Sequence, residues 1–545
     1  MAEQVLQGTE LYATVKVMYH LSYRTADGME HSARVDSDGI AWPASEASQL
    51  GILTTREAEA HRVFVCPAEA LTLTALEADL SCDLTGADTI YLNGYNSWTD
   101  SWERPVDDRM RGLKRVPKRV VEHYVLDGSG DYRFTPEDER RGHQHGFGYG
   151  YLRYGEDVLL VGSLNESSGF TTITEDLERQ ALTLSKEVPA RELAAGEQVE
   201  VMSFALVDGT LDEAVERWFE LAEMTPRPAK PLVGFSSWYR YYQDISQEKL
   251  EKDFAAVRDL LAESDLGECQ PIFQIDDGYT KIGDWTTPYT DRFPDGMAHF
   301  PKLCDEAGLL PGLWMAPFVC ETKSQTFRNH QDWLLYDETG ELVVAGSNWS
   351  GYYPLDTRNP EVRAYVSEAL RTATEEWGYR FLKLDFLFAA CMVPHDGLNR
   401  GELMSDALDL LRASVPEGVA FDLCGVPIAS ALGKTEYCRI GPDVGLDWDD
   451  AIQMRMLHRE RVSTRRSLHN TRGRAHLDGR AFRNDPDVFF LRHDVKLTKR
   501  QRSSLIGADA ALGGMFLTSD DVAAWDTNQR LTFARTLAIF VDRTR

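Results

Sequence analysis

Hydrophobic and polar residues alternate along roughly the first 228 residues of the chain. Short alternating runs occupy residues 11–23, 89–95, 158–162 and 199–207, with clusters of Gly, Asp and Asn between them. A side-chain period of two is expected of strands with one buried face. Many short strands separated by turns are typical of a β-sandwich. We therefore predict an N-terminal β-sandwich domain over residues 1–228, including a linking helix at residues 211–224.

The pattern changes after a connector that Pro226, Pro228 and Pro231 make stiff. Beyond it, short apolar runs alternate with amphipathic segments. The runs expected to be strands are residues 233–238, 271–275, 309–316, 381–386, 419–423, 437–440, 488–490 and 515–517. Apolar residues recur at helical spacing within residues 250–261 and 362–377. Alternating strands and helices predict an α/β fold, with a (β/α)8 TIM barrel over residues 229–545.

Composition narrows the class of protein. Hydrophobic residues make up 43% of the chain and charged residues 27%, which is ordinary for a globular protein. No stretch approaches the roughly 20 apolar residues that span a bilayer, so we expect no membrane association. The formal net charge of −29 repels phosphate backbones, and nucleic acid is therefore not an expected partner. A neutral sugar is not hindered by this charge.

The compartment is predicted from the chain start and the cysteines. Residues 1–12 lack a basic segment followed by an apolar run, so no secretory signal is expected. The eight cysteines show neither close pairing nor zinc-ligand spacing, which indicates reduced thiols. A cytoplasmic protein is expected. No motif calls for a metal or a cofactor.

Two short motifs place carboxylates at the ends of predicted strands. Lys383, Leu384 and Asp385 close one apolar run, and residues 439–443 (RIGPD) close another with Asp443. Two carboxylates on neighbouring strand ends suit glycoside hydrolysis, in which one attacks a sugar carbon and the other protonates the leaving oxygen. The carboxyl ends of barrel strands are where the active sites of this fold lie.

The residues around these acids resemble a known family. The motifs, in chain order, are NSW (96–98), GFSSWY (234–239), FQIDDGY (273–279), KLDF (383–386), CGVP (424–427), RIGPD (439–443) and NDPD (484–487). Together they are similar to the retaining α-galactosidases of glycoside hydrolase family 36, a family that also includes α-N-acetylgalactosaminidases. The resemblance implies a retaining exo-acting α-glycosidase that hydrolyses terminal non-reducing α-galactosides by double displacement. Its substrate would be an oligosaccharide or glycoconjugate.

The resemblance also implies roles for the acids and their neighbours. Asp385 would be the nucleophile and Asp443 the general acid and base. Lys383 lies two residues before Asp385 on the strand and should share its face, where a cation keeps a carboxylate ionised. Arg439 is expected to fork onto the nucleophile or a sugar hydroxyl.

Further residues are matched to the sugar site. Asp276 and Asp277 would grip the axial 4-hydroxyl and the 6-hydroxyl, which makes the site selective for galactose. Among the expected substrate-binding residues, Trp314, Trp238 and Tyr239 could form an apolar wall that stacks on the sugar. Trp98, from the N-terminal domain, would reach over the barrel mouth. Cys424 lies in the loop expected to meet the sugar 2-position.

Departures from the family pattern leave alternatives open. Residues 423–425 read LCG where many members have GCG, and residues 445–450 are unusually acidic. An α-galactosaminidase or α-N-acetylgalactosaminidase on the same scaffold, a transferase, and a non-catalytic carbohydrate-binding protein are the alternatives. The C-terminal β domain usual in the family is expected to be absent, and this leaves open whether the chain forms a homo-oligomer.

Overall fold

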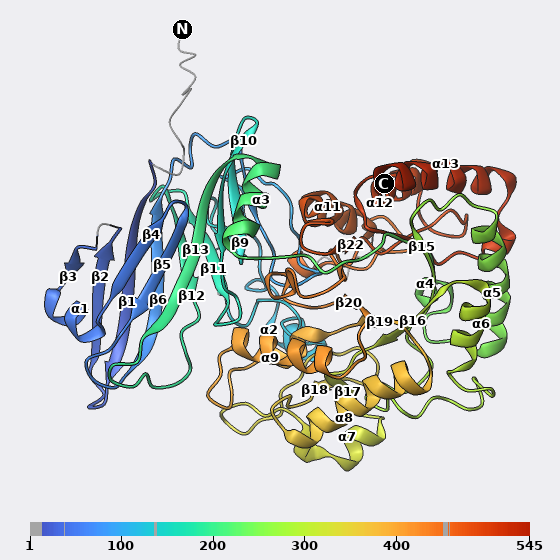
Figure 1. The fold of residues 1–545 in the computed structure, drawn as a ribbon, viewed down its shortest axis with the longest axis horizontal. Coiled ribbons are helices and arrows are strands. Elements are labelled where there is room, and N and C mark those ends of the chain that lie inside the picture. Colours follow the sequence, from blue (N-terminus) through green and yellow to red (C-terminus); the bar gives the residue numbers. More distant parts are fainter. Residues whose placement is uncertain (1–13, 38, 136–138, 451–455, 457, 545) are drawn as a thin grey trace, which may run out of the picture.

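The computed structural model describes residues 14–37, 39–135, 139–450, 456 and 458–544. The N-terminal part holds two antiparallel sheets, on the left of Figure 1. The seven-stranded sheet has the order β3-β2-β1-β6-β12-β11-β8, and the six-stranded sheet has the order β4-β5-β13-β10-β9-β7. Their bounds are β1 (Lys16–Thr25), β2 (Glu30–Asp36), β3 (Ala41–Trp42), β4 (Leu53–Glu57), β5 (Ala60–Val65), β6 (Leu71–Ser81), β7 (Thr89–Leu92), β8 (His145–Phe147), β9 (Tyr149–Tyr154), β10 (Asp157–Ser163), β11 (Thr171–Asp176), β12 (Ala181–Lys186) and β13 (Val199–Thr210).

One hydrophobic core draws on both of these sheets. Tyr19 and Leu21 of β1 and Leu80 of β6 pack in the same cluster as Val63 of β5 and Phe204 of β13. Side chains of β1 alternate between buried and partly exposed, as the period of two predicted. Three helices accompany the sheets: α1 (Ala44–Leu50), α2 (Lys118–Tyr124) and α3 (Leu211–Leu221). The linking helix predicted at residues 211–224 is α3, which begins with a capping box formed by Thr210 and Glu213.

The C-terminal part is built on a nine-stranded parallel sheet with the order β22-β21-β20-β19-β16-β15-β14-β24-β23. Its strands are β14 (Leu232–Ser236), β15 (Gln270–Ile275), β16 (Leu310–Met315), β19 (Phe381–Leu384), β20 (Ala420–Leu423), β21 (Tyr437–Arg439), β22 (Arg483–Asp485), β23 (Val488–Phe489) and β24 (Met515–Thr518). The outermost strands in this order, β22 and β23, are joined by only two residues. The sheet therefore curls until its ends meet, and it is barrel-like.

Helices follow these strands and cover the sheet (Figure 1). They are α4 (Trp238–Tyr241), α5 (Gln247–Ala262), α6 (His299–Ala307), α7 (Gln325–Asn329), α8 (Pro360–Arg371), α9 (Arg400–Ala413), α10 (Ile428–Ala431), α11 (Thr464–Gly473), α12 (Lys499–Leu512) and α13 (Thr527–Thr544). All eight predicted strands are present. Two features were not predicted: β22, and a small hairpin of β17 (Val319–Glu321) and β18 (Tyr352–Pro354).

Arg474 joins the two parts of the molecule. Its guanidinium is fully buried and donates to the Asn93 side chain and to the carbonyls of Gly94, Asn96 and Ser97, as well as to Ile440. A buried guanidinium is stable only when its donors are satisfied. Arg474 thus fixes the loop at residues 93–98 against the strand ends. Among the described residues, no helix has the length and apolarity needed to cross a membrane.

Candidate active site

Asp385 is held rigidly at the end of β19. One carboxylate oxygen accepts the indole N–H of Trp314 at 3.0 Å and the other accepts the backbone N–H of Phe386 at 2.7 Å. Its own backbone N–H donates to the Met315 carbonyl of the neighbouring strand at 2.8 Å. Burial raises the pKa of Asp385, while the nearby Lys383 charge opposes this shift. Trp314, expected in an apolar wall, therefore has a contact that orients the proposed nucleophile.

Lys383 forms a buried ion pair with Asp276. Its ammonium lies 3.0 Å from an Asp276 carboxylate oxygen, which also accepts from the Gln274 amide at 3.0 Å. Burial alone would lower the pKa of Lys383, but the Asp276 charge outweighs it, and the pKa is well above its usual value. The ammonium therefore stays charged between Asp276 and Asp385.

Asp277 is buried, and its hydrogen-bond donors among the described residues are neutral. The Gln243 amide and the Trp349 indole donate to the same carboxylate oxygen at 2.7 and 2.9 Å. Burial raises the pKa of Asp277 to about 6, and its donors oppose the shift. Such a carboxylate gains from a ligand that brings further hydroxyl donors.

Asp443 follows β21 and is more open to solvent, with 43% of its side chain exposed. Its carboxylate accepts from the Arg439 guanidinium at 2.8 Å, and the same guanidinium nitrogen lies 2.6 Å from Asp487. Arg439 therefore contacts Asp443, not Asp385, and the expected fork onto the nucleophile is not formed. Because Arg439 follows Cys438 on β21, its position is set by the strand that also delivers Asp443.

The N-terminal part contributes Trp98 to the same region. The Trp98 indole donates to the Cys424 sulfur at 3.3 Å, and the Gly425 N–H donates to the Ser97 hydroxyl at 2.6 Å. Gly425 has φ +60°, and a Cβ there would lie 3.0 Å from the Trp98 ring. Burial and the Asp385 charge raise the pKa of the Cys424 thiol well above its usual value, so it stays protonated.

One cavity of about 570 Å³ contains Trp98, Asp385 and Asp443. Its remaining wall comes from segments far apart in the chain: Tyr124, Val125, Leu126, Ser129, Ala345, Gly346, Ser347, Asn348, Tyr352, Phe386, Met456, Glu460 and Val462. The two acids also interact electrostatically, because the negative charge of Asp443 raises the pKa of Asp385. The two predicted acids thus line the same cavity, as the two carboxylates of a glycoside hydrolase do.

Trp98, Asp385 and Asp443 line the 570 Å³ cavity, and the other eight predicted site residues do not. Tyr239 and Trp238 are two of these eight. Tyr239 is buried and its hydroxyl donates to Asp487, while Trp238 packs edge-on against Tyr242. Neither is among the residues that line the 570 Å³ cavity. The structure thus gives Tyr239 a supporting contact behind Arg439 and Asp443, and the stacking role of both side chains stays a prediction.

Four polar or aromatic residues near the site were not singled out as site residues from the sequence: Gln243, Trp349, Asp487 and Glu460. Asp487 is buried, and burial raises its pKa to about 7. Glu460 is buried beside the cavity, accepts from Thr99 at 2.8 Å and has its pKa raised to about 7, again mainly by burial. The NDPD motif could have indicated Asp487, whereas nothing in the sequence around Trp349 marks it.

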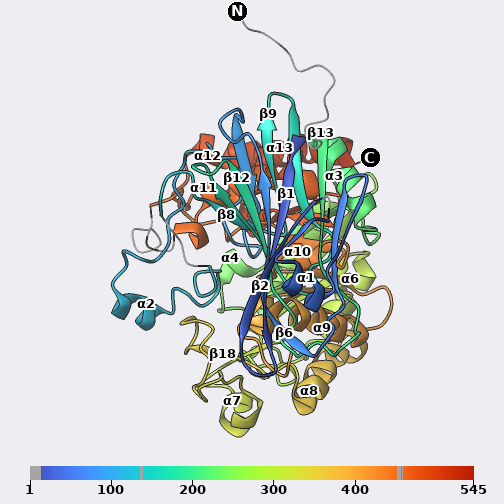
Figure 2. The ribbon, with the colours of Figure 1, turned by 90° about the vertical axis from the view of Figure 1, so that its left-hand side faces the viewer.

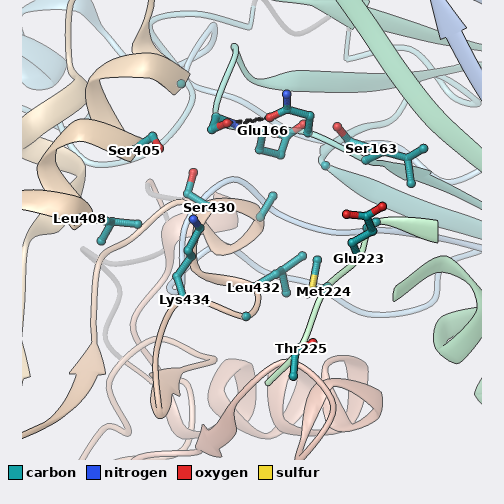
Figure 3. Close-up of a pocket in the computed structure, with 18 of the residues that line it drawn as sticks. Ser163, Glu166, Glu223, Met224, Thr225, Ser405, Leu408, Ser430, Leu432 and Lys434 are labelled. Atoms are coloured by element: carbon teal, nitrogen blue, oxygen red, sulfur yellow. Dashed lines mark hydrogen bonds between the residues drawn. The ribbon is translucent and has the colours of Figure 1, made fainter. Parts of the chain in front are cut away.

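Elsewhere, a cavity of about 420 Å³ lies between the two parts of the molecule (Figure 3). Ser430 and Lys434 lie on one side of it, with Glu223 and Met224 on another. It contains none of the predicted site residues. Among the described residues, Glu251, Asp295 and His299 could together reach one metal ion, but His299 is already 2.8 Å from Glu251, and this group too lies outside the predicted site.

Comparisons with known proteins show what this chain is similar to. The Melibiase family model matches residues 228–397, which cover β14 to β19 and include Asp276, Asp277 and Asp385. The α-galactosidase Mel36A of Lactobacillus acidophilus is 26% identical over 161 residues, 28% of this chain and 20% of that protein. The α-galactosidase AgaA of Geobacillus stearothermophilus is 28% identical over 107 residues, 20% of this chain and 14% of that protein. These alignments therefore span a fifth or less of the curated relatives.

Solved structures match over much more of the chain. The α-galactosidase of Thermus thermophilus in complex with p-nitrophenyl α-D-galactopyranoside is 27% identical, with a TM-score of 0.70, covering 89% of this chain and 94% of that one. The structure of AgaA covers 96% of this chain and 76% of its own at 13% identity and a TM-score of 0.59, which shows the shared fold.

Paired carboxylates that line one cavity at the carboxyl ends of a curled parallel sheet are of the kind that glycoside hydrolysis uses. The Melibiase family model over residues 228–397, the curated relatives and the Thermus structure all make this chain similar to α-galactosidases.

Proposed function

We propose that this chain is a retaining exo-acting α-galactosidase that hydrolyses terminal non-reducing α-galactosides by double displacement. The observation that carries the proposal is the single cavity that Asp385 and Asp443 share, together with the buried Lys383–Asp276 ion pair, whose lysine charge acts on Asp385. The relative from Thermus thermophilus, solved with an aryl α-galactoside and with stachyose, supports an oligosaccharide substrate.

The proposed roles follow from the contacts. Asp385, fixed by Trp314 and Phe386, attacks the anomeric carbon, and the Lys383 charge beside it favours its ionised form. Asp443, held by Arg439 and open to solvent, protonates the leaving oxygen and then activates water. Asp276 and Asp277 accept hydrogen bonds from the sugar hydroxyls. Trp98 and Cys424 would meet the sugar on the side of its 2-position.

A panel of aryl α-glycosides tests this proposal. Galactosides should be turned over far faster than glucosides, which differ only at C4. Proton NMR of the first-formed sugar should show the α-anomer, and an initial β-anomer would overturn the assignment of nucleophile and acid. Faster turnover of 2-amino or 2-acetamido galactosides would instead support the galactosaminidase or N-acetylgalactosaminidase alternative. No turnover of any member would favour a non-catalytic binding protein.

We also propose the two domains of the chain and its cellular compartment. The two antiparallel sheets with their common core support an N-terminal β-sandwich over residues 1–228, and the curled sheet with its helices supports a (β/α)8 barrel over residues 229–545. All eight cysteines are free, which supports a reducing compartment such as the cytoplasm. A homo-oligomer would be detected by light scattering.

A further inference from the structure

The segment at residues 109–119 is strongly basic in a chain that is otherwise acidic. It contains six basic residues, Arg109, Arg111, Lys114, Arg115, Lys118 and Arg119, and no acidic one, whereas the whole chain has a net charge of −29. A local cluster of one sign against an opposite background creates a focused field at that place. Such a cluster attracts anions that the rest of the surface repels.

Three of these arginines surround a cavity. Arg109, Arg111 and Arg115 line a space of about 360 Å³ together with Val116, Glu139, Met456 and His458. Arg115 lies 3.3 Å from Glu139. Within the described part of the chain, neither Arg109 nor Arg111 has a carboxylate within ion-pair distance. Burial, followed by the charge of Arg111, lowers the pKa of His458, in keeping with a positive environment.

This cationic cavity adjoins the proposed catalytic one. Met456 lines both cavities. The basic segment also runs into α2, which stands out at the edge of the molecule (Figure 2), and the residues that follow, Tyr124, Val125 and Leu126, line the cavity of Asp385 and Asp443. A ligand that leaves the catalytic cavity on this side would therefore meet the arginines.

Resting on the proposed function, we propose that Arg109, Arg111 and Arg115 form a subsite for an anionic group on the aglycone, so that the preferred substrates are α-galactosides linked to an acidic sugar. Because the proposed function assigns Asp276, Asp277 and Lys383 to the galactose, the aglycone is the part of the substrate that can reach the basic cavity. Guanidinium groups pair in forked geometry with carboxylates and sulfates, whereas a neutral aglycone would make no use of them.

The test uses matched disaccharides in which α-galactose is linked either to glucuronate or to the equally large neutral glucuronamide. The wild type should show kcat/KM roughly tenfold higher for the uronate, through KM, with the preference declining as salt is added. The double variant Arg109→Gln/Arg111→Gln should lose this preference. The matched control Lys118→Gln/Arg119→Gln removes two charges of the same segment that do not line the cavity, and it should keep most of the preference.

A second pair, a galactosyl-glucose with and without a sulfate ester on the glucose, distinguishes carboxylate from sulfate. Preference for either anion supports the subsite and names its ligand. Equal rates within both pairs, with p-nitrophenyl α-galactoside hydrolysed normally, would overturn the subsite alone. Lack of hydrolysis of p-nitrophenyl α-galactoside by the wild type would overturn the proposed function instead.

Discussion

The strand ends that carry Asp385 and Asp443 hold their carboxylates in different ways. Both oxygens of Asp385 accept N–H donors, and only 9% of the residue is exposed. Asp443 has one charged partner, Arg439, and a side chain that is 43% exposed. A nucleophile must stay at a fixed position beside the sugar carbon, whereas an acid and base must exchange protons with water in every cycle. The difference in burial fits the proposed roles of Asp385 as nucleophile and Asp443 as acid and base.

Removing the rigid acid should have the largest effect. Asp385→Ala should lower kcat by roughly 10⁴-fold or more, because no other group can form the covalent intermediate. Azide should restore part of the activity and yield a β-galactosyl azide, since a small anion can enter the vacated space. Substantial activity of this variant without azide would remove Asp385 from the nucleophile role.

Removing the exposed acid should have a smaller effect that depends on the substrate. Asp443→Ala should slow substrates with poor leaving groups by roughly 10²- to 10³-fold, because only these need a proton during departure. Activated aryl galactosides should be cleaved in a first burst and then accumulate glycosyl-enzyme on Asp385, detectable by mass spectrometry. Equal losses for both kinds of substrate would contradict the acid and base assignment.

The sequence predicted eight strands of the parallel sheet but not the ninth, β22, which lies at one end of the strand order. The predicted barrel strands were runs of mostly apolar residues. In the structure β14, β16 and β19 are buried along their whole length, and this burial is what the pattern records. β22 was missed because its residues, Arg483, Asn484 and Asp485, are polar. They lie in the strand because β21 pairs with them through the backbone, which composition does not reveal.

The site shows the same limit. Asp385, Asp443 and Asp276 could be located because they follow strands within recognisable motifs, and Lys383 because it lies in such a motif on β19. The hydrogen-bond donors that orient these residues could not be located from the sequence. Gln243 and Trp349 reach Asp277 from the segment after α4 and from the loop before β18, and neither contact leaves a local signal. The prediction that Arg439 contacts Asp385 was wrong, because its guanidinium contacts Asp443 instead. Geometry at the strand end, and not residue type, decides which of the two carboxylates it reaches.

Asp277 is a third buried or partly buried carboxylate to compare with Asp385 and Asp443, and its described donors are neutral. Its ionisation should affect the free energy of unfolding. Its folded pKa of about 6 lies above the usual 3.8, so the folded state holds the proton more tightly than the unfolded state. Stability should therefore decline as pH rises from about 4 to 6, and the cost then persists at higher pH. A shift of about two pKa units corresponds to about 3 kcal/mol.

Asp277→Asn removes this cost while its amide oxygen can still accept from Gln243 and Trp349. The variant should be more stable than the wild type by up to about 3 kcal/mol above pH 6 and by little at pH 4, as measured by urea denaturation at both values. Asp276→Asn is the matched control. It removes the carboxylate that lies 3.0 Å from the buried Lys383 ammonium and should be destabilising at pH 7.5. A gain at Asp277 of equal size at both pH values would show that its ionisation is not the cause.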